Sequence, residues 1–280
     1  MTASTTDSAV PSQAPAIAVV TLASAARRAH VDNQLAVVGR SSEVRRILVW
    51  LGDDSPTGID ADVVLSVPPG PDGLRLAAAR NAGADRAVAD GAGLVVFLDA
   101  DCVPDPSLFS AYAAAAAAQP EAVLCGPVTY LPPGVDSLDP AALDRHRSPH
   151  AARPTPPRGQ VVLAPADDYR LFWSLSFALT ATAWSTGPRF DETFEGYGGE
   201  DTDFAYRLRS AGVPLAWVGG ADAYHQHHPT TSPPVAHLDD ILRNGALFAR
   251  TWGEWPMLGW LEAFERNGLV RRVGAGWARR

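Results

Sequence analysis

A run of five apolar residues, Leu-Val-Val-Phe-Leu at 94–98, leads straight into Asp99-Ala100-Asp101 and constrains the fold more than any other stretch. A short apolar run of this kind predicts a strand that is buried on both faces, as in a parallel sheet. Open α/β sheets bind their ligands beyond the carboxyl ends of the strands. Because alternate residues of an extended chain point the same way, Asp99 and Asp101 can converge there on one ligand.

The segments around this strand alternate between strand and helix patterns, which predicts an α/β fold. Residues 16–22 and 46–51 are apolar and rich in Val and Ile, and residues 29–39 between them have helical spacing of apolar side chains. We expect one domain with a mostly parallel central sheet flanked by helices. Further helices are predicted at 74–90, at 106–118 with Asp105 as N-cap, and from 198–201 to about 212, and further strands at 122–126 and 215–218.

Composition excludes several classes of protein. A formal net charge of −8 argues against binding to a nucleic-acid backbone, which depends on clustered Lys and Arg. No apolar run approaches the roughly 18 residues of a membrane span.

The two ends of the chain and its cysteines bear on where the protein is located. Residues 1–15 have neither a basic nor a long apolar region, so we expect a disordered tail and, by default, a cytoplasmic protein. Peripheral membrane contact through the basic C-terminal residues is the alternative. Cys102 and Cys125 are too few for a disulfide framework and are expected to be reduced.

A second acidic motif, Gly198-Gly199-Glu200-Asp201-Thr202-Asp203, is predicted to open a helix. Small residues let the backbone approach a ligand closely, and acids are favourable at a helix N-terminus. Helix capping alone is the competing explanation. It is preferred for Asp203, because Arg207 follows at i+4 and can pair with it.

Three histidines within four residues follow the last predicted strand. His225, His227 and His228 are consistent with a structural role, with a zinc pair formed by His225 and His227, or with one histidine joining the acids of the first motif. We prefer His225 together with Asp101, because two hard oxygen donors that suit Mg²⁺ or Mn²⁺ otherwise lack a third ligand.

The three motifs in this order, Leu-Asp-Ala-Asp-Cys-Val-Pro-Asp-Pro, Gly-Tyr-Gly-Gly-Glu-Asp-Thr-Asp-Phe and Tyr-His-Gln-His-His, resemble family 2 glycosyltransferases of the glycosyltransferase-A (GT-A) fold. The Gly-Gly-Glu-Asp stretch is similar to the galactosyltransferase and N-acetylgalactosaminyltransferase-type branch. The resemblance covers about residues 16–230, which implies a GT-A catalytic domain there, with residues 231–280 as a helical extension packed on it. Residues 131–165, rich in Pro, Arg and His, are expected to form a flexible loop region that borders the site.

The resemblance also implies roles for individual residues. Asp101 would ligate the metal, with Asp99 nearer the ribose or the metal's water shell and His225 as a further metal ligand. Asp201 would act as the base, and Glu200 would hold the acceptor hydroxyls. The remaining expected contacts are with the nucleotide, by Asp53 or Asp54, Arg80 and the backbone near Thr21, and with the acceptor, by Tyr197, Gly199 and Trp173.

The implied activity is transfer of a sugar from a nucleotide-sugar, with UDP favoured, to a carbohydrate or other hydroxyl acceptor. It would be an inverting single displacement that needs Mn²⁺ or Mg²⁺. Two departures concern the substrates: residues 21–24 lack the family's Pro-x-Tyr-Asn pattern, and Gly187-Pro188-Arg189-Phe190 replaces the usual Gly-Gly-Phe. The sugar, the acceptor and the oligomeric state are left open.

Two other functions would use the same site residues. A metal-dependent hydrolase would use the acids and histidines to activate water. A catalytically silent nucleotide-sugar-binding module would keep the fold without turnover. A dinucleotide-binding dehydrogenase is disfavoured, because no Gly-x-Gly-x-x-Gly follows the first strand.

Overall fold

The computed structural model describes residues 16–280, so the predictions for residues 1–15 lie outside the described part. The core is a sheet of eight strands: β1 (Ile17–Ala23), β2 (Val44–Trp50), β3 (Val63–Ser66), β4 (Leu94–Leu98), β6 (Val123–Cys125), β8 (Val161–Leu163), β9 (Ser176–Thr180) and β10 (Leu215–Val218). Their order is β3-β2-β1-β4-β9-β6-β10-β8. The first four strands and the β6–β10 pair are parallel, whereas β9 and β8 run antiparallel to their neighbours. The predicted α/β class is confirmed.

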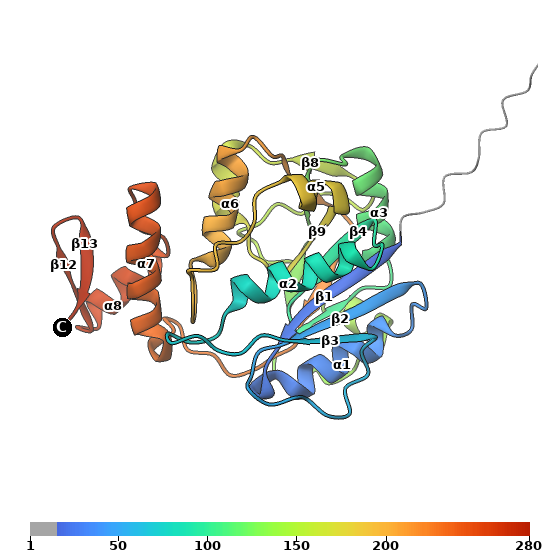
Figure 1. Cartoon of the computed structure of the whole chain (residues 1–280), viewed down its shortest axis with the longest axis horizontal. Coiled ribbons are helices and arrows are strands. Elements are labelled where there is room, and N and C mark those ends of the chain that lie inside the picture. Colours follow the sequence, from blue (N-terminus) through green and yellow to red (C-terminus); the bar gives the residue numbers. More distant parts are fainter. Residues whose placement is uncertain (1–15) are drawn as a thin grey trace, which may run out of the picture.

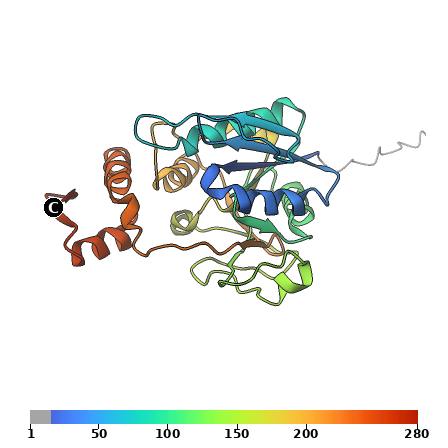
Figure 2. The ribbon, with the colours of Figure 1, turned by 90° about the horizontal axis from the view of Figure 1, so that it is seen from below.

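Helices cover both faces of this sheet (Figures 1 and 2). One face packs against α1 (Arg28–Val38) and α3 (Leu108–Ala118), and the other against α2 (Leu76–Ala89), α5 (Ala181–Thr186) and α6 (Glu200–Ser210). Along β1 the burial alternates as period-two geometry requires: Val20 faces α2, and Val19 faces the opposite core. A central strand with both faces covered explains why β4 is a continuous apolar run.

Gly83 lies where α2 packs closely against the sheet. A Cβ at this position would lie 2.4 Å from a methyl carbon of Val20 and 2.9 Å from one of Val49. We predict that Gly83→Ala lowers the free energy of unfolding by about 1–3 kcal/mol, the usual cost of overpacking. Urea unfolding of the variant measures this. Gly259→Ala is the matched control, because a Cβ on this residue of α8 (Leu258–Arg266) meets nothing within 4 Å and should be neutral or stabilising.

A second, three-stranded sheet lies beyond the end of β4. It consists of β5 (Cys102–Pro104), β11 (Ala223–His225) and β7 (Val128–Tyr130), with β11 in the middle. β11 runs antiparallel to β5 and parallel to β7. This pairing was not predicted, and it brings the histidine segment of the chain beside Asp99-Ala100-Asp101.

Two local predictions differ from the structure. Asp105 was expected to cap a helix starting at Pro106, but α3 begins at Leu108, and Asp105 instead accepts hydrogen bonds from the backbone and hydroxyl of Ser107 (2.9 and 2.6 Å). The region 131–165 was expected to be a flexible loop. It contains α4 (Pro140–Asp144), and its end forms β8, which pairs with β10.

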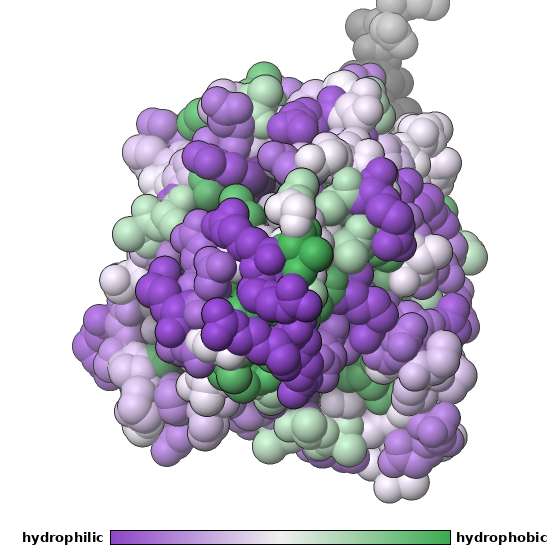
Figure 3. Space-filling model, turned by 90° about the vertical axis from the view of Figure 1, so that its left-hand side faces the viewer, coloured by the Kyte–Doolittle hydropathy of each residue, from purple (hydrophilic) through white to green (hydrophobic). Residues whose placement is uncertain are grey.

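The C-terminal elements form a separate group beside α6 (Figure 1). This group comprises α7 (Leu238–Trp252), α8 and a hairpin of β12 (Val270–Val273) and β13 (Gly276–Arg279), with its own small apolar core. The hairpin corrects the expectation that this segment is helical throughout. On the face in Figure 3, hydrophobic residues form small patches among hydrophilic ones. Within residues 16–280, none of the helices has the length and apolar character needed to cross a membrane.

Candidate active site

The pairing of β5 with β11 assembles the centre of the site. His225 lies opposite Cys102 in this ladder, and the backbone N–H of Gln226 donates to the carbonyl of Asp101 at 2.7 Å. As a result the Asp101 carboxylate lies 3.3 Å from Nε2 of His225 and 3.2 Å from Nε2 of His228. Potential ligand atoms of these three residues all lie within 4.8 Å of one another.

The chemistry of this triad, Asp101, His225 and His228, suits a divalent cation. Burial would raise the pKa of Asp101, but its hydrogen bond to His228 and the positive charges around it outweigh burial, so its pKa lies below the usual value. Burial lowers the pKa of His225, which favours the neutral imidazole that a metal requires. One carboxylate and two imidazoles favour Mn²⁺ over Mg²⁺, which prefers oxygen ligands only. Arg27 also reaches this carboxylate, at 3.4 Å.

Among the three histidines, the structure separates His227 from the other two. Its side chain is exposed and is not part of the triad. The zinc pair of His225 and His227 is therefore not brought together around Asp101, whereas His228, which had no separate assignment, is.

Gln34 is a supporting residue that the sequence reading missed. It is completely buried, and its amide donates to the backbone carbonyls of Asp99 (2.5 Å) and Cys102 (2.8 Å). Its oxygen accepts a hydrogen bond from the Thr21 hydroxyl at 2.6 Å, so this hydroxyl is engaged within the protein. The available signal was a polar residue on the apolar face of α1, next to Leu35. Gln34 thus holds the turn that carries both aspartates.

Asp99, which was also expected near the metal, is not part of the triad and lies beside a buried arginine. Arg80 is 4% exposed; it donates to Glu200 at 2.9 Å and to Ser174 at 2.7 Å, and lies 3.6 Å from Asp99. Arg80 therefore connects the two acidic motifs, which are about one hundred residues apart in the chain. Burial raises the pKa of Asp99 to about 7; Arg80 opposes this, and the charges of Asp101, Glu200 and Asp201 add to it.

Asp201 lies in the first turn of α6, next to Glu200. Burial and the negative charge of Glu200 raise its pKa to about 7, although Arg80 and hydrogen bonds from Thr202 oppose the shift. Its carboxylate accepts the backbone N–H of Thr202 at 2.7 Å. A carboxylate with a pKa near neutrality is suited to accepting a proton at physiological pH. Asp203 is the expected partner of Arg207, at 2.5 Å.

The other predicted site residues differ in their surroundings. Asp53 and Asp54 are exposed, and Asp54 accepts a hydrogen bond from the Trp50 indole at 3.1 Å. Tyr197 stacks on His237 with 4.3 Å between ring centroids. Gly199 is the N-cap of α6, with φ at 93°. Within residues 16–280, none of these four residues makes a hydrogen bond or ion pair with the triad.

An aromatic row runs from the triad to Trp173. The ring of Tyr130, 46% exposed, stacks on His225 at 4.6 Å, and the edges of His150 connect Tyr130 with Trp173 at 5.8 and 4.9 Å. The guanidinium of Arg153 lies buried between Trp173 and Trp217, 5.5 and 5.1 Å from the ring centroids. Part of the 131–165 region therefore borders the site as a packed element.

Part of the chain is similar to known glycosyltransferases. Residues 65–159 match the family model of glycosyl transferase family 2, and this segment includes β4 and the Asp-Ala-Asp motif. The validoxylamine A glucosyltransferase of Streptomyces hygroscopicus subsp. jinggangensis (strain 5008) is 30% identical over 260 residues, which cover 78% of this chain and 58% of the relative. The chain thus spans little more than half the length of that relative.

Solved structures agree on the fold. S. aureus TarS superposes with a TM-score of 0.55 at 12% identity, covering 83% of this chain and 39% of TarS. GalNAc-T7, in a crystal structure with UDP, GalNAc and Mn²⁺, superposes with a TM-score of 0.52 at 13% identity, covering 86% of this chain and 48% of that one. Residues 65–159 of this chain thus match glycosyl transferase family 2, and the described residues have a GT-A-like α/β fold.

Proposed function

We propose that this protein is a metal-dependent glycosyltransferase that transfers a sugar from a UDP-sugar to a hydroxyl acceptor with inversion. The observation that carries the proposal is the triad, whose ligand atoms lie within 4.8 Å of one another beside the carboxyl end of β4. A position at the end of a central strand is where such sheets bind ligands. The presence of UDP and Mn²⁺ in the GalNAc-T7 structure supports the choice of donor and metal.

In this proposal Asp101, His225 and His228 hold Mn²⁺. When bound, the cation supplies Lewis-acid stabilisation of the negative charge on the departing UDP. Asp99 is proposed to face the donor's ribose, and its short distance to Arg80 keeps it on that side of the turn. The exposed acids Asp53 and Asp54 are proposed to contact the nucleotide base.

On the acceptor side, Asp201 is proposed to take the proton of the attacking hydroxyl. Its pKa of about 7 fits this role. Glu200 is proposed to orient the acceptor through its second oxygen, because Arg80 holds the first one at 2.9 Å. Trp173 and Tyr197 provide ring faces for a sugar. The Gly-Gly-Glu-Asp segment supports membership of the galactosyl- and N-acetylgalactosaminyltransferase-like branch, with residues 16–230 as catalytic domain and 231–280 as its extension.

Product analysis tests the proposal against the hydrolase alternative. The protein with Mn²⁺ is incubated with a panel of UDP-sugars, with and without glycoside acceptors, and products are separated by mass spectrometry. Transfer predicts a new glycoside and UDP release that depends on the acceptor. A free sugar released at an equal rate without acceptor would support the hydrolase, and the absence of any product across donors and acceptors would support the silent module.

The pH dependence of the transfer rate should follow the ionisation of the proposed base, Asp201. Asp201 acts in its deprotonated form, and burial raises its pKa to about 7 from 3.8. The rate should therefore be nearly constant above about pH 8 and should fall about tenfold for each pH unit below 7. Titration of Asp99, whose pKa is also about 7, would steepen this fall. A profile of kcat against pH that stays flat down to pH 5 would exclude Asp201 as the base.

A further inference from the structure

We propose that α7 is a positioning element for catalysis, in which Asn244 and Asp240 fix the backbone of residues 195–199 and thereby the orientation of Glu200 and Asp201. The inference rests on the proposed function and extends it to a part of the chain outside the family match at 65–159. No residue of α7 was predicted to take part in the site.

Asn244 is the central contact. It is 2% exposed, and its side-chain amide donates to the carbonyls of Glu195 at 2.9 Å and Gly198 at 2.8 Å. These two carbonyls flank Gly196 and Tyr197, so a single amide spans the whole turn before α6. A buried amide with both N–H groups engaged on the backbone fixes that backbone more strictly than apolar packing does, because each unpaired carbonyl would cost about 1–3 kcal/mol.

One turn earlier on α7, Asp240 contacts the same loop. It accepts the backbone N–H of Tyr197 at 3.1 Å and pairs with Arg243 at 2.9 Å. Arg243 in turn donates to the carbonyl of Glu195 at 2.7 Å. Three α7 side chains therefore hold the loop: its carbonyls accept hydrogen bonds from Asn244 and Arg243, and its Tyr197 N–H donates to Asp240.

The glycines of the motif allow the C-terminal elements to lie close to the loop backbone. Gly196, Gly198 and Gly199 have φ values of 71°, 87° and 93°, a region that other residues rarely adopt. A Cβ on Gly196 would lie 2.6 Å from the Asp240 carboxylate, and one on Gly198 would lie 2.9 Å from Sδ of Met257. The close approach that the sequence suggested for a ligand is made, at these two positions, by the C-terminal elements.

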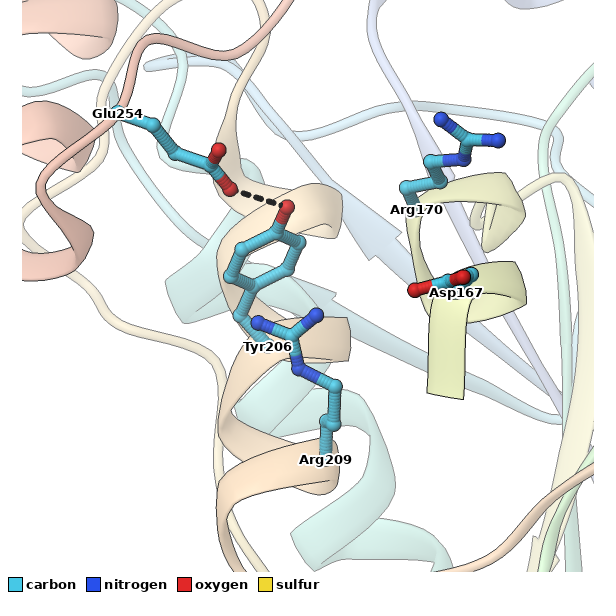
Figure 4. Close-up of a pocket in the computed structure, with 5 residues that line it drawn as sticks. All are labelled: Asp167, Arg170, Tyr206, Arg209 and Glu254. Carbon is cyan, nitrogen blue, oxygen red and sulfur yellow. Dashed lines mark hydrogen bonds between the residues drawn. The ribbon is translucent and has the colours of Figure 1, made fainter. Parts of the chain in front are cut away.

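The same elements hold α6 further along. The Trp252 indole at the end of α7 donates to the buried Asp203 at 2.8 Å. One turn on, the Tyr206 hydroxyl donates to Glu254 at 2.6 Å, at the edge of a polar pocket that also includes Arg209 (Figure 4). Helix α6 is thus fixed both at its catalytic N-terminus and along its length.

The test compares variants of α7 in the full chain. Asn244→Ala removes the side-chain hydrogen bonds to the carbonyls of Glu195, Tyr197 and Gly198. Asp240→Ala removes the acceptor of the Tyr197 N–H and the partner of Arg243. Asp240→Asn retains an oxygen that can accept that bond, and Asp239→Ala removes a neighbouring carboxylate that faces Arg279. Each variant is assayed for kcat of transfer, for affinity for UDP with Mn²⁺, and for hydrogen exchange of the amides of residues 196–201.

We expect Asn244→Ala and Asp240→Ala to lower kcat about 10- to 100-fold, the scale of a small misplacement of catalytic groups. Affinity for UDP should change less than about twofold, loop amides should exchange faster, and Asp240→Asn and Asp239→Ala should resemble the wild type. Unchanged kcat in Asn244→Ala, or equal losses in Asp240→Asn and Asp240→Ala, would overturn the positioning role. If Asn244→Ala does not fold, the Asp240 pair decides. A wild type without transfer refutes the proposed function itself, and the inference with it.

Discussion

Replacement of Asp201 by Asn is expected to lower kcat of transfer by about 10²- to 10⁴-fold, the contribution of a well-placed general base. The amide has nearly the same shape and can still accept the Thr202 N–H, which now lies 2.7 Å from the carboxylate. It cannot accept the acceptor's proton. Steady-state kinetics with saturating donor and Mn²⁺ measure the loss.

Binding of UDP with Mn²⁺ should change less than about threefold in this variant, because the triad is formed by other residues, and a threefold change is about 0.65 kcal/mol. Asp239→Asn, a change at an exposed residue of α7, is the matched control and should keep full activity. A near-normal kcat in Asp201→Asn would show that Asp201 is not the base. Glu200 would then be the next residue to test as the base.

The second large effect is expected at the histidines, where two adjacent residues should behave oppositely. His228→Ala removes a member of the triad, and its affinity for Mn²⁺ should fall at least about 10- to 100-fold, since even outer-shell changes have effects of that size. His227→Ala should have little effect, because that side chain is exposed and outside the triad. Titration with Mn²⁺ in the presence of UDP measures both.

The comparison is sharp because the two substitutions are chemically identical and adjacent in the chain. Equal losses in both variants would indicate a general effect on the segment after β11. A loss in His227→Ala alone would mean that the pair of His225 and His227 binds the metal, which would require a different arrangement of this segment.

The elements with strong local patterns were predictable from the sequence. The strand at 94–98 and the strand at 215–218 coincide with β4 and β10, because continuous apolar runs bounded by turn residues leave few alternatives. Helix α6 begins within the acidic motif, as predicted, and the i+4 pair of Asp203 and Arg207 forms as its spacing indicates. The carboxylates of the site were found for the same reason, since they lie directly at the end of β4 or the start of α6.

What depends on contacts between distant segments was not predictable in this way. The pairing of β5 with β11 joins residues more than one hundred positions apart, and it brings the segment that carries His228 beside Asp101. Three-residue strands carry too little periodicity to be recognised. The same holds for Gln34, whose partners belong to other segments.

The contacts of the C-terminal helices with the rest of the chain were also not predictable from the sequence. Its apolar spacing predicts helices but not what their polar faces contact, so the bonds from Asn244 and Asp240 to the loop before Glu200 could not be foreseen. The glycines of that loop were expected to allow a ligand to approach, because a glycine indicates that some group lies close to the backbone but not which group. In the structure, the close groups are Asp240 for Gly196 and Met257 for Gly198.

Calorimetric titration of UDP into the protein, with and without Mn²⁺ and with Asp101→Ala in parallel, measures whether Asp101 belongs to a metal-dependent donor site. We expect UDP to bind the wild type tightly only when Mn²⁺ is present, and Asp101→Ala to abolish this dependence together with most of the affinity. UDP binding that is equally strong without metal, or unchanged in Asp101→Ala, would contradict the assignment of Asp101, His225 and His228 as the metal and donor site.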